Sequence, residues 1–299
     1  MRDREVLTAE QVAFYRTQGY ILLEERVPME VVEGLRAEIA RIVEEARGLE
    51  ASNDRIDLED SHRPDDPKVR RIKRPHALSD GVADLMRSEH ILAPVRDLLG
   101  PDVRLHGTKL NMKSAGYGAA VEWHQDFAFY PHTNDDLLAV GVFIDDMEIE
   151  NGPLMAIPGS HAGPLYDHHA RNVFVGALDA RRDGLDLEDA VPLVGPAGTI
   201  SLHHVRLVHG SALNTSARDR RLLLYEMAAA DAFPVMGSMT SYMDMETFDS
   251  LMLCGEPTLR PRLSDVPVRV PQPQPPENGS IYEVQTGLSA RSFDRLNPR

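Results

Sequence analysis

Residues 198–230 read GTISLHHVRLVHGSALNTSARDRRLLLYEMAAA and contain two apolar runs of strand length on either side of a polar turn. The first run leads into His209-Gly-Ser211, and the second begins at Arg220. Short runs rich in Leu, Ile and Val between turn residues are typical of β-strands. We therefore predict two strands here, with the polar segment turning the chain between them.

Similar short runs precede this pair from residue 103 onward, and no helical pattern separates them. They read RLHGTKLNMKS, LLAVGVFIDDM and GPLMAIPGS, and the dipeptides Asn151-Gly152 and Pro158-Gly159 mark turns between strands. Several strands in succession favour a sandwich or a barrel. We expect a mainly β fold with its core in residues 103–233.

The first 102 residues predict a helical flank with one short strand. Thr8-Ala-Glu-Gln11 is a capping box that starts a helix, and residues 19–23 read as a strand. Residues 52–67 are polar and read as a loop. An apolar stripe at helical spacing predicts a second helix, and further helices are expected near residues 80–87 and 91–99; the stripe comprises Val32, Leu35, Ile39, Ile42 and Val43.

Two segments depart from the strand pattern. Residues 162–192 are rich in Asp, Arg and His and read as a lid inserted into the barrel, since long loops in compact domains are often functional. Seven prolines between 257 and 276 make residues 257–299 a Pro-rich C-terminal tail, either wrapped around the domain or hanging free. We predict one domain over residues 1–256.

The amino-acid composition indicates where in the cell the protein is expected and which kinds of partner it can bind. No apolar run approaches the roughly 18 residues of a membrane span, and the lone Cys254 cannot form an internal disulfide. Without a secretory signal at its start, the chain is expected in the cytoplasm. A net charge of -15 argues against a nucleic-acid partner, so we interpret the basic stretch KVRRIKRPH at residues 68–76 as a solvated loop. A small-molecule partner is expected, and an oligomer is possible.

The stretch Val121-Glu-Trp-His-Gln-Asp-Phe127 carries a potential metal motif. His124 and Asp126 are two residues apart on an expected strand, so their side chains emerge on the same face and can share one ion. The motif is weak alone, because about one His-x-Asp is expected by chance in a chain of this composition.

His209 strengthens the metal hypothesis, since it ends another apolar strand 85 residues after His124. An antiparallel barrel can bring two such strands together. Two imidazoles and one carboxylate with open positions form the facial triad of non-haem Fe(II) oxygenases. Zinc could occupy similar ligands, although its structural sites usually have four ligands and favour thiolates.

Arg220 is the third candidate, at the start of the strand that follows His209. A buried guanidinium can hold a carboxylate through two parallel hydrogen bonds. The alternative is an exposed arginine paired with Asp219 or Glu226.

The assembled pattern resembles the phytanoyl-CoA dioxygenase family of Fe(II)/2-oxoglutarate oxygenases, which includes ectoine hydroxylase. The resemblance rests on Trp123-His-Gln-Asp126, Asn151-Gly-Pro-Leu154, Pro158-Gly-Ser-His161, His209-Gly-Ser211 and Arg220, together with the strand after Gly19. It implies a double-stranded β-helix, a jelly-roll barrel of the cupin type. It also implies that His124, Asp126 and His209 bind Fe(II), that Arg220 and Ser211 hold the distal carboxylate of 2-oxoglutarate, and that O2 is the other cosubstrate.

The reaction implied by the resemblance is hydroxylation, or another oxidation, of a C–H bond in a small organic substrate with release of succinate and CO2. Halogenating relatives replace the metal-binding Asp with a small residue, so the intact Asp126 favours hydroxylation. Many members carry Trp in the strand where this chain has Gly141 or Val142, so the pocket wall is expected to differ there. A non-catalytic cupin-like ligand- or metal-binding protein, and a metal-dependent hydrolase or isomerase, are the alternatives.

The sequence gives less information about which residues contact the substrate. Lys109, Asn111 and Lys113 alternate with apolar residues and share one strand face, which points either into the barrel or to solvent. Four residues after the metal motif could line the substrate entrance or fill the core: Phe127, Phe129, Tyr130 and His132. His203 and His204 precede His209 and occupy opposite strand faces, and we expect at least one of them to be a hydrogen-bonded core or surface histidine.

Overall fold

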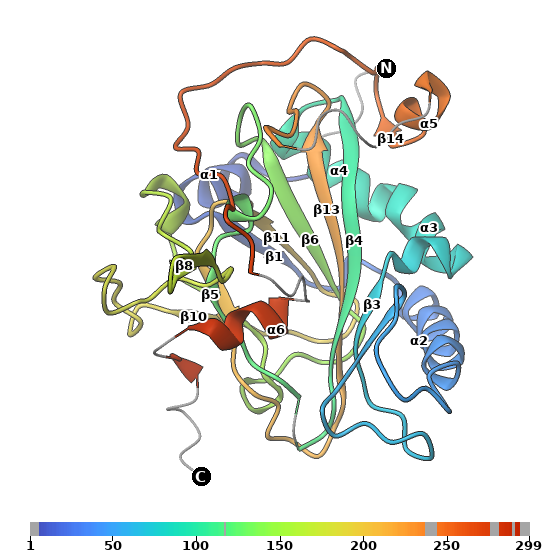
Figure 1. The fold of residues 1–299 in the computed structure, drawn as a ribbon. Helices are drawn as coiled ribbons and strands as arrows, with labels where there is room; N and C mark the ends of the chain where they lie inside the picture. The colour runs from blue at the N-terminus through green and yellow to red at the C-terminus, as the bar shows by residue number, and fades with distance from the viewer. Residues whose placement is uncertain (1–5, 117, 237–243, 276–280, 289–290, 294–299) are drawn as a thin grey trace.

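The computed structural model describes residues 6–116, 118–236, 244–275, 281–288 and 291–293. Two antiparallel sheets lie face to face, with helices on the outside of the larger one (Figure 1). The larger sheet has the order β1-β11-β6-β13-β4-β3-β2, with β14 also paired to β4, and the smaller sheet has the order β10-β7-β12-β5.

The helices of the described chain are α1 (Ala9–Gln18), α2 (Met29–Glu44), α3 (Asp80–Arg87), α4 (Glu89–Leu99), α5 (Met245–Asp249) and α6 (Ile281–Val284). The strands are β1 (Tyr20–Leu23), β2 (Ile56–Leu58), β3 (Val69–Lys73), β4 (Val103–Lys113), β5 (Val121–His124), β6 (Leu137–Phe143), β7 (Leu154–Ala156), β8 (His169–Ala170), β9 (Val173–Phe174), β10 (Val191–Leu193), β11 (Ile200–His204), β12 (His209–Ser211), β13 (Arg220–Ala229) and β14 (Met252–Cys254). Within the described ranges, none of these helices has both the length and the apolar composition that crossing a membrane requires.

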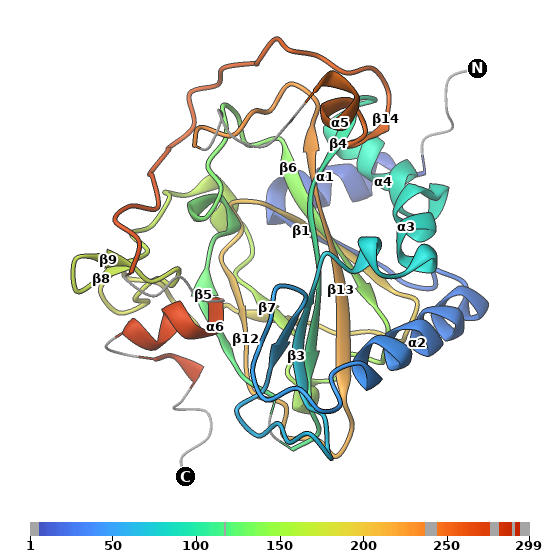
Figure 2. The ribbon, with the colours of Figure 1, turned by 45° about the vertical axis from the view of Figure 1, so that its right-hand side comes forward.

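Strand β13 shows why the larger sheet has helices on one side only. Because side chains alternate across a strand, Leu223 and Tyr225 point to the helical layer, whereas Leu222 and Leu224 point between the two sheets. Helices α2, α3 and α4 cover the outer face (Figure 2). The inner face is therefore left to the second sheet and to the cavity between them.

The helical flank follows the sequence pattern closely. The Thr8 hydroxyl accepts a hydrogen bond from the Gln11 backbone while the Gln11 side chain accepts one from the Thr8 backbone, so the predicted capping box is confirmed. Of the predicted stripe on α2, Val32, Leu35, Ile39 and Ile42 are buried and Val43 is partly buried against the same core. Helix α1 ends at Gly19, whose φ of 81° favours glycine.

The segment between α2 and α3 differs from the prediction. Residues 52–67, expected to be a loop, contain β2, and the basic stretch expected to be a solvated loop forms β3. Asp57 on β2 explains both differences, because its buried carboxylate pairs with Arg71 and Lys73 on the neighbouring strand. The cross-strand ion pairs let a charged sequence extend the sheet.

The C-terminal segment wraps around the domain. Residues 255–275 run without regular structure, and the part that includes Pro276 lies outside the described residues. Arg262 pairs with Asp231 and Asp136, and further along α6 lies beside β5 (Figure 1). Gln285, just after α6, is buried: its side chain accepts a hydrogen bond from the Glu122 backbone and donates one to the Gly176 carbonyl.

We predict that Gln285→Ala lowers the free energy of unfolding by about 1–3 kcal/mol, because it leaves a buried N–H and a buried carbonyl without partners. Thr286→Ala, at the exposed neighbouring position, should change stability by less than about 0.5 kcal/mol. Chemical denaturation followed by circular dichroism measures both. Equal effects of the two substitutions would contradict this account of the segment.

Candidate functional site

Two histidines face each other across the smaller sheet. His209 on β12 is paired in register with His124 on β5, and the centroids of their rings are 4.1 Å apart. The Nδ1 atom of His124 lies 2.8 Å from the Glu122 carbonyl, and that of His209 lies 2.9 Å from the Leu207 carbonyl. A carbonyl only accepts, so each Nδ1 carries the proton and each Nε2 presents a lone pair, as in metal-binding histidines.

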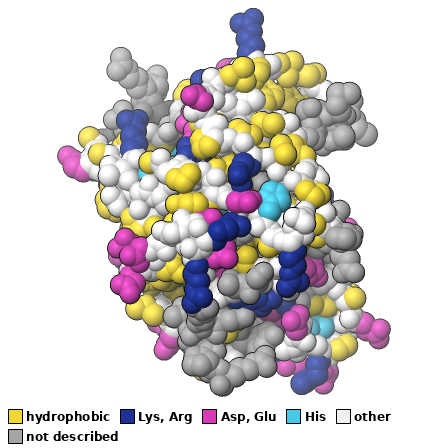
Figure 3. All heavy atoms as spheres, turned by 60° about the vertical axis from the view of Figure 1, so that its left-hand side comes forward, with side chains coloured by type: hydrophobic (Ala, Val, Ile, Leu, Met, Phe, Trp, Pro, Cys, Tyr) yellow, Lys and Arg dark blue, Asp and Glu magenta, His cyan; other side chains and the backbone are white. Residues whose placement is uncertain are grey.

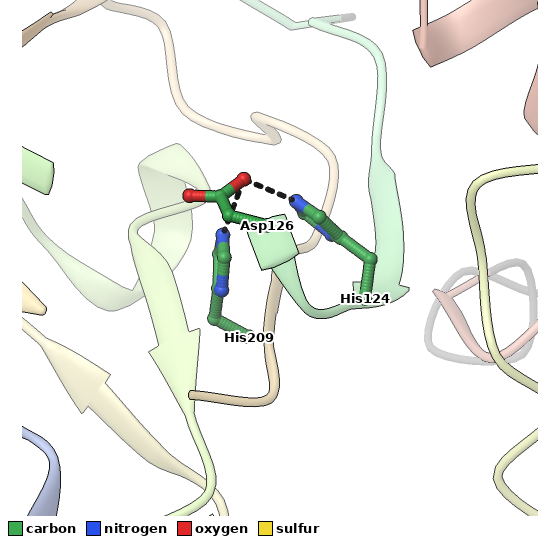
Figure 4. A group of neighbouring side chains, drawn as sticks. All are labelled: His124, Asp126 and His209. Carbon is green, nitrogen blue, oxygen red and sulfur yellow. Dashed lines mark ion pairs between the residues drawn. The ribbon is translucent and has the colours of Figure 1, made fainter. Parts of the chain in front are cut away.

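Asp126 lies close to both histidines, but it lies in a turn and not on the strand that the sequence pattern predicted. Strand β5 ends at His124, and Asp126 starts a short 3₁₀ turn, so the expectation that both lie on one strand is wrong. The turn nevertheless directs the carboxylate toward both rings (Figure 4). One of its oxygens lies 3.7 Å from Nε2 of His124 and 4.0 Å from Nε2 of His209.

These three groups fit a metal ion. All three are buried, and one ligand atom from each lies within 4.8 Å of the others. Ligand atoms bound at about 2.1 Å on one face of an ion lie about 3 Å apart, so the carboxylate and the rings need to approach by roughly 1 Å to share one ion. Two neutral nitrogens and one carboxylate on one side of a site form the donor set of non-haem Fe(II) oxygenases.

The surroundings keep all three groups in the metal-binding protonation state. Burial lowers the pKa of His209 to about 4, and burial together with the neighbouring His209 holds the pKa of His124 well below its ordinary value. Burial alone would raise the pKa of Asp126, but Lys109 and the nearby histidines outweigh it and hold that pKa well below its usual range. At neutral pH both imidazoles are neutral and the carboxylate is ionised.

Arg220 is fully buried, which rules out the exposed alternative. Its Nη2 donates to the Gly152 carbonyl at 2.7 Å, while Nε and Nη1 have no hydrogen-bond partner in the described parts of the chain. Burial lowers its pKa to about 10, so the side chain is charged at neutral pH. A buried cation with two free donors fits a carboxylate that the protein itself does not supply.

Beside Arg220, Lys113 lies in the paired position on β4. Its ammonium group contacts the backbone carbonyls of Ser211 and Ala212. Burial and the nearby guanidinium hold the pKa of Lys113 well below its ordinary value. Ser211, on β12, lines the same end of the site.

One cavity of about 430 Å³ connects the three metal-site residues to this basic end. It lies between the sheets, and its volume falls in the range of about 300–1,000 Å³ found for small-molecule sites. The predicted residues that line it are His124, Asp126, His209, Arg220, Ser211, Lys109, Asn111, Lys113, Phe129 and Tyr130. The polar face of β4 therefore points into the barrel.

Phe127 and His132 do not line this cavity. Phe127 is fully buried against Ala128 and Val205, so it fills the core, which was the alternative to lining the entrance. His132 is buried with Nδ1 at 2.7 Å from the Tyr130 carbonyl. The 3₁₀ turn at residues 126–128 rotates Phe127 away from the site and brings Phe129 to it.

Several cavity residues were not predicted as site residues. His203 has its Nε2 3.7 Å from the second Asp126 oxygen, whereas His204 packs against His161 on the other strand face. Glu226, which continues the inward face of β13, forms an ion pair of 2.7 Å with Lys109. Period-two alternation from Arg220 would have found Glu226.

Three other unpredicted lining residues come from distant segments: Arg71 on β3, Phe174 on β9 and Tyr282 on α6. No local sequence signal links these positions to the metal motif. Their place depends on how far-apart segments pack together.

The expected difference at Gly141 has a packing reason. A Cβ atom at this position would lie 2.6 Å from the Ser201 hydroxyl and 3.2 Å from the Leu222 side chain. A large side chain such as Trp has no room there. Leu222 and Leu224 form this part of the cavity wall instead.

Comparison with known proteins identifies the family. The phytanoyl-CoA dioxygenase (PhyH) family matches residues 15–222. The chain belongs to this family. It is 39% identical over 291 residues to a probable alpha-ketoglutarate-dependent hypophosphite dioxygenase from Stutzerimonas stutzeri, covering 95% of this chain and 99% of that protein.

Ectoine dioxygenases are more distant relatives. The Bordetella parapertussis enzyme is 28% identical over 255 residues, covering 79% of this chain and 77% of the enzyme. The crystal structure of EctD from S. alaskensis with bound Fe matches with a TM-score of 0.63 at 26% identity, over 77% of this chain and 79% of that one. A second structure of EctD contains 2-oxoglutarate and 5-hydroxyectoine, so relatives bind small molecules.

These findings confirm the double-stranded β-helix and the enzyme class predicted from the sequence. The protein is an Fe(II)- and 2-oxoglutarate-dependent dioxygenase, neither a non-catalytic cupin nor a hydrolase. The resemblance to ectoine hydroxylase is confirmed at the level of the family. The sequence identity to the hypophosphite dioxygenase, 39%, is higher than that to the ectoine dioxygenase from Bordetella parapertussis, 28%.

We predict that His209→Ala or Asp126→Ala lowers Fe(II) affinity by at least 10- to 100-fold, the loss already typical of substitutions that only support a metal ligand. Iron content after anaerobic loading and desalting measures the effect. His204→Ala is the matched control, because this partly buried histidine faces His161 and not the metal site. Full iron retention by Asp126→Ala would refute the assignment.

Proposed function

We propose that this dioxygenase oxidises a small phosphorus oxyanion, with hypophosphite as the first compound to test and alkylphosphonates as the second. The supporting observation is the set of cations that line the cavity beyond the metal site, among them Arg71, Lys73, Arg74 and Lys109. The relative of 39% identity, named for hypophosphite, covers nearly the whole chain. Alkylphosphonates combine a related phosphorus oxyanion with the C–H bond expected from the sequence.

The local charge agrees with an anionic substrate although the whole chain carries -15. On the face turned forward in Figure 3, Lys and Arg side chains gather around the middle among acidic ones. Charges lining a cleft raise the local concentration of an oppositely charged substrate.

We assign Fe(II) to His124, Asp126 and His209, and the distal carboxylate of 2-oxoglutarate to Arg220 and Ser211. Bound iron and 2-oxoglutarate supply the oxidant: one atom of O2 enters succinate and the other enters the substrate, and CO2 is released. Lys113, next to Arg220, adds a donor to the same carboxylate. Phe129 and Phe174, in edge-to-face contact at 5.2 Å, limit access of water to the metal side.

We further propose that residues 162–192 act as the predicted lid, since Phe174 from this segment lines the cavity. The neighbouring Val175 packs against Leu288 of the C-terminal segment, which supports the lid from outside. We retain the cytoplasm as the proposed location.

We predict that Arg220→Ala raises the KM for 2-oxoglutarate by about 10- to 150-fold, the loss expected for about 1.5–3 kcal/mol of charged hydrogen bonds. Steady-state succinate formation measures this value. Arg221→Ala is the control on the same strand, because Arg221 faces outward and pairs with Asp145. An unchanged KM in Arg220→Ala would remove the proposed anchor.

We predict that hypophosphite or methylphosphonate stimulates succinate formation at least tenfold above the substrate-independent rate, whereas ectoine does not. Phosphorus NMR would show phosphite from hypophosphite, in which one P–H bond has become P–OH, or hydroxymethylphosphonate from methylphosphonate. Stimulation by ectoine alone would instead favour a small organic zwitterion as the substrate class.

A further inference from the structure

Arg74 has an unusual backbone conformation directly after β3. Its φ and ψ are 48° and 52°, in the left-handed region that glycine and asparagine favour. The backbone N–H donates to the Thr108 carbonyl at 3.2 Å, and Pro75 follows. Such conformations are less stable for an arginine and cluster at functional sites. Backbone preference therefore does not explain why an arginine occupies this position.

The Arg74 side chain lines the same cavity as the metal site and is exposed at its mouth. Across the described residues, its guanidinium forms no hydrogen bond or ion pair. The neighbouring basic side chains already form ion pairs: Arg71 and Lys73 both pair with Asp57. Lys109 pairs with Glu226 at 2.7 Å.

The two remaining cations of the cavity, Lys113 and Arg220, lie at the end that we assign to 2-oxoglutarate. Arg74 is therefore the cavity cation that no carboxylate of the described chain neutralises and no cosubstrate claims. A guanidinium offers two parallel hydrogen bonds to an oxyanion, in a geometry that phosphorus oxyanions match.

We propose that Arg74 binds the oxyanion of the substrate at the mouth of the cavity and thereby helps to select anionic substrates. This inference rests on the proposed function, which supplies the phosphorus oxyanion. Arg74 is a substrate-binding residue and has no role in holding iron or 2-oxoglutarate.

The test uses Arg74→Gly, because glycine suits the backbone conformation while the substitution removes the whole side chain, guanidinium included. We expect the KM for hypophosphite, or for methylphosphonate if that is the substrate, to rise about tenfold to hundredfold. The KM for 2-oxoglutarate and the iron content should stay unchanged, and the melting temperature should not fall. Arg74→Lys, which keeps the charge but loses the paired donors, should lie in between.

Two controls separate binding from structure. Glu25→Gly changes another exposed residue with a positive φ, of 52°, outside the cavity lining. Arg87→Gln removes an exposed arginine of α3 that is likewise absent from the lining. Neither should alter the substrate KM. An unchanged substrate KM in Arg74→Gly would overturn the proposal and leave the residue a purely structural role.

A failure of the proposed function is distinguishable from a failure of this inference. If neither phosphorus compound stimulates turnover in the wild type, the proposed substrate class is wrong. Inorganic phosphate then serves as the probe, as an inhibitor of the slow turnover of 2-oxoglutarate without substrate. Inhibition that weakens about tenfold in Arg74→Gly supports an anion site at Arg74, whereas equal or absent inhibition overturns it.

Discussion

The pairing of β12 with β5 is the constraint on which the site depends. Their register places His209 opposite His124, and the backbone carbonyls of the same two segments fix which nitrogen of each ring faces inward. The metal ligands are therefore positioned by main-chain geometry before any ion binds. Only the Asp126 carboxylate comes from a turn. That turn begins two residues after β5 ends, so the short connection to the strand limits where the carboxylate can lie.

A second consequence of this architecture is an unbalanced charge at the far end of the cavity. The register of β13 with β4 sets Arg220 beside Lys113, and both are buried. Folding alone leaves the donors of Arg220 partly unsatisfied and depresses the pKa of Lys113. A buried cation without a partner is costly, and a carboxylate bound beside Arg220 would offset this cost. Preorganisation of this kind favours binding because the side chains need not be ordered when the ligand arrives.

Much of this could be predicted from the sequence, because its signals are local. The capping box, the apolar stripe of α2 and the alternating strands are short-range patterns, and the spacing from His209 to Arg220 reflects one turn between two strands. The failures are also physical. The 3₁₀ turn at Asp126 leaves no periodic signal, and β3 forms because Asp57 neutralises its cations from another strand. Tyr282 reaches the cavity only through packing of a segment more than 150 residues from the metal motif.

The buried anchor at Gln285 gives the carboxyl-terminal region an architectural part in the cavity. Its side chain bridges the backbone of β5 near Glu122 to the region of Gly176, and Phe293 stacks on Trp123 at 5.3 Å behind the metal-bearing strand. Substitutions at Gln285 or Phe293 therefore act on the reaction chamber from behind the strand that bears His124.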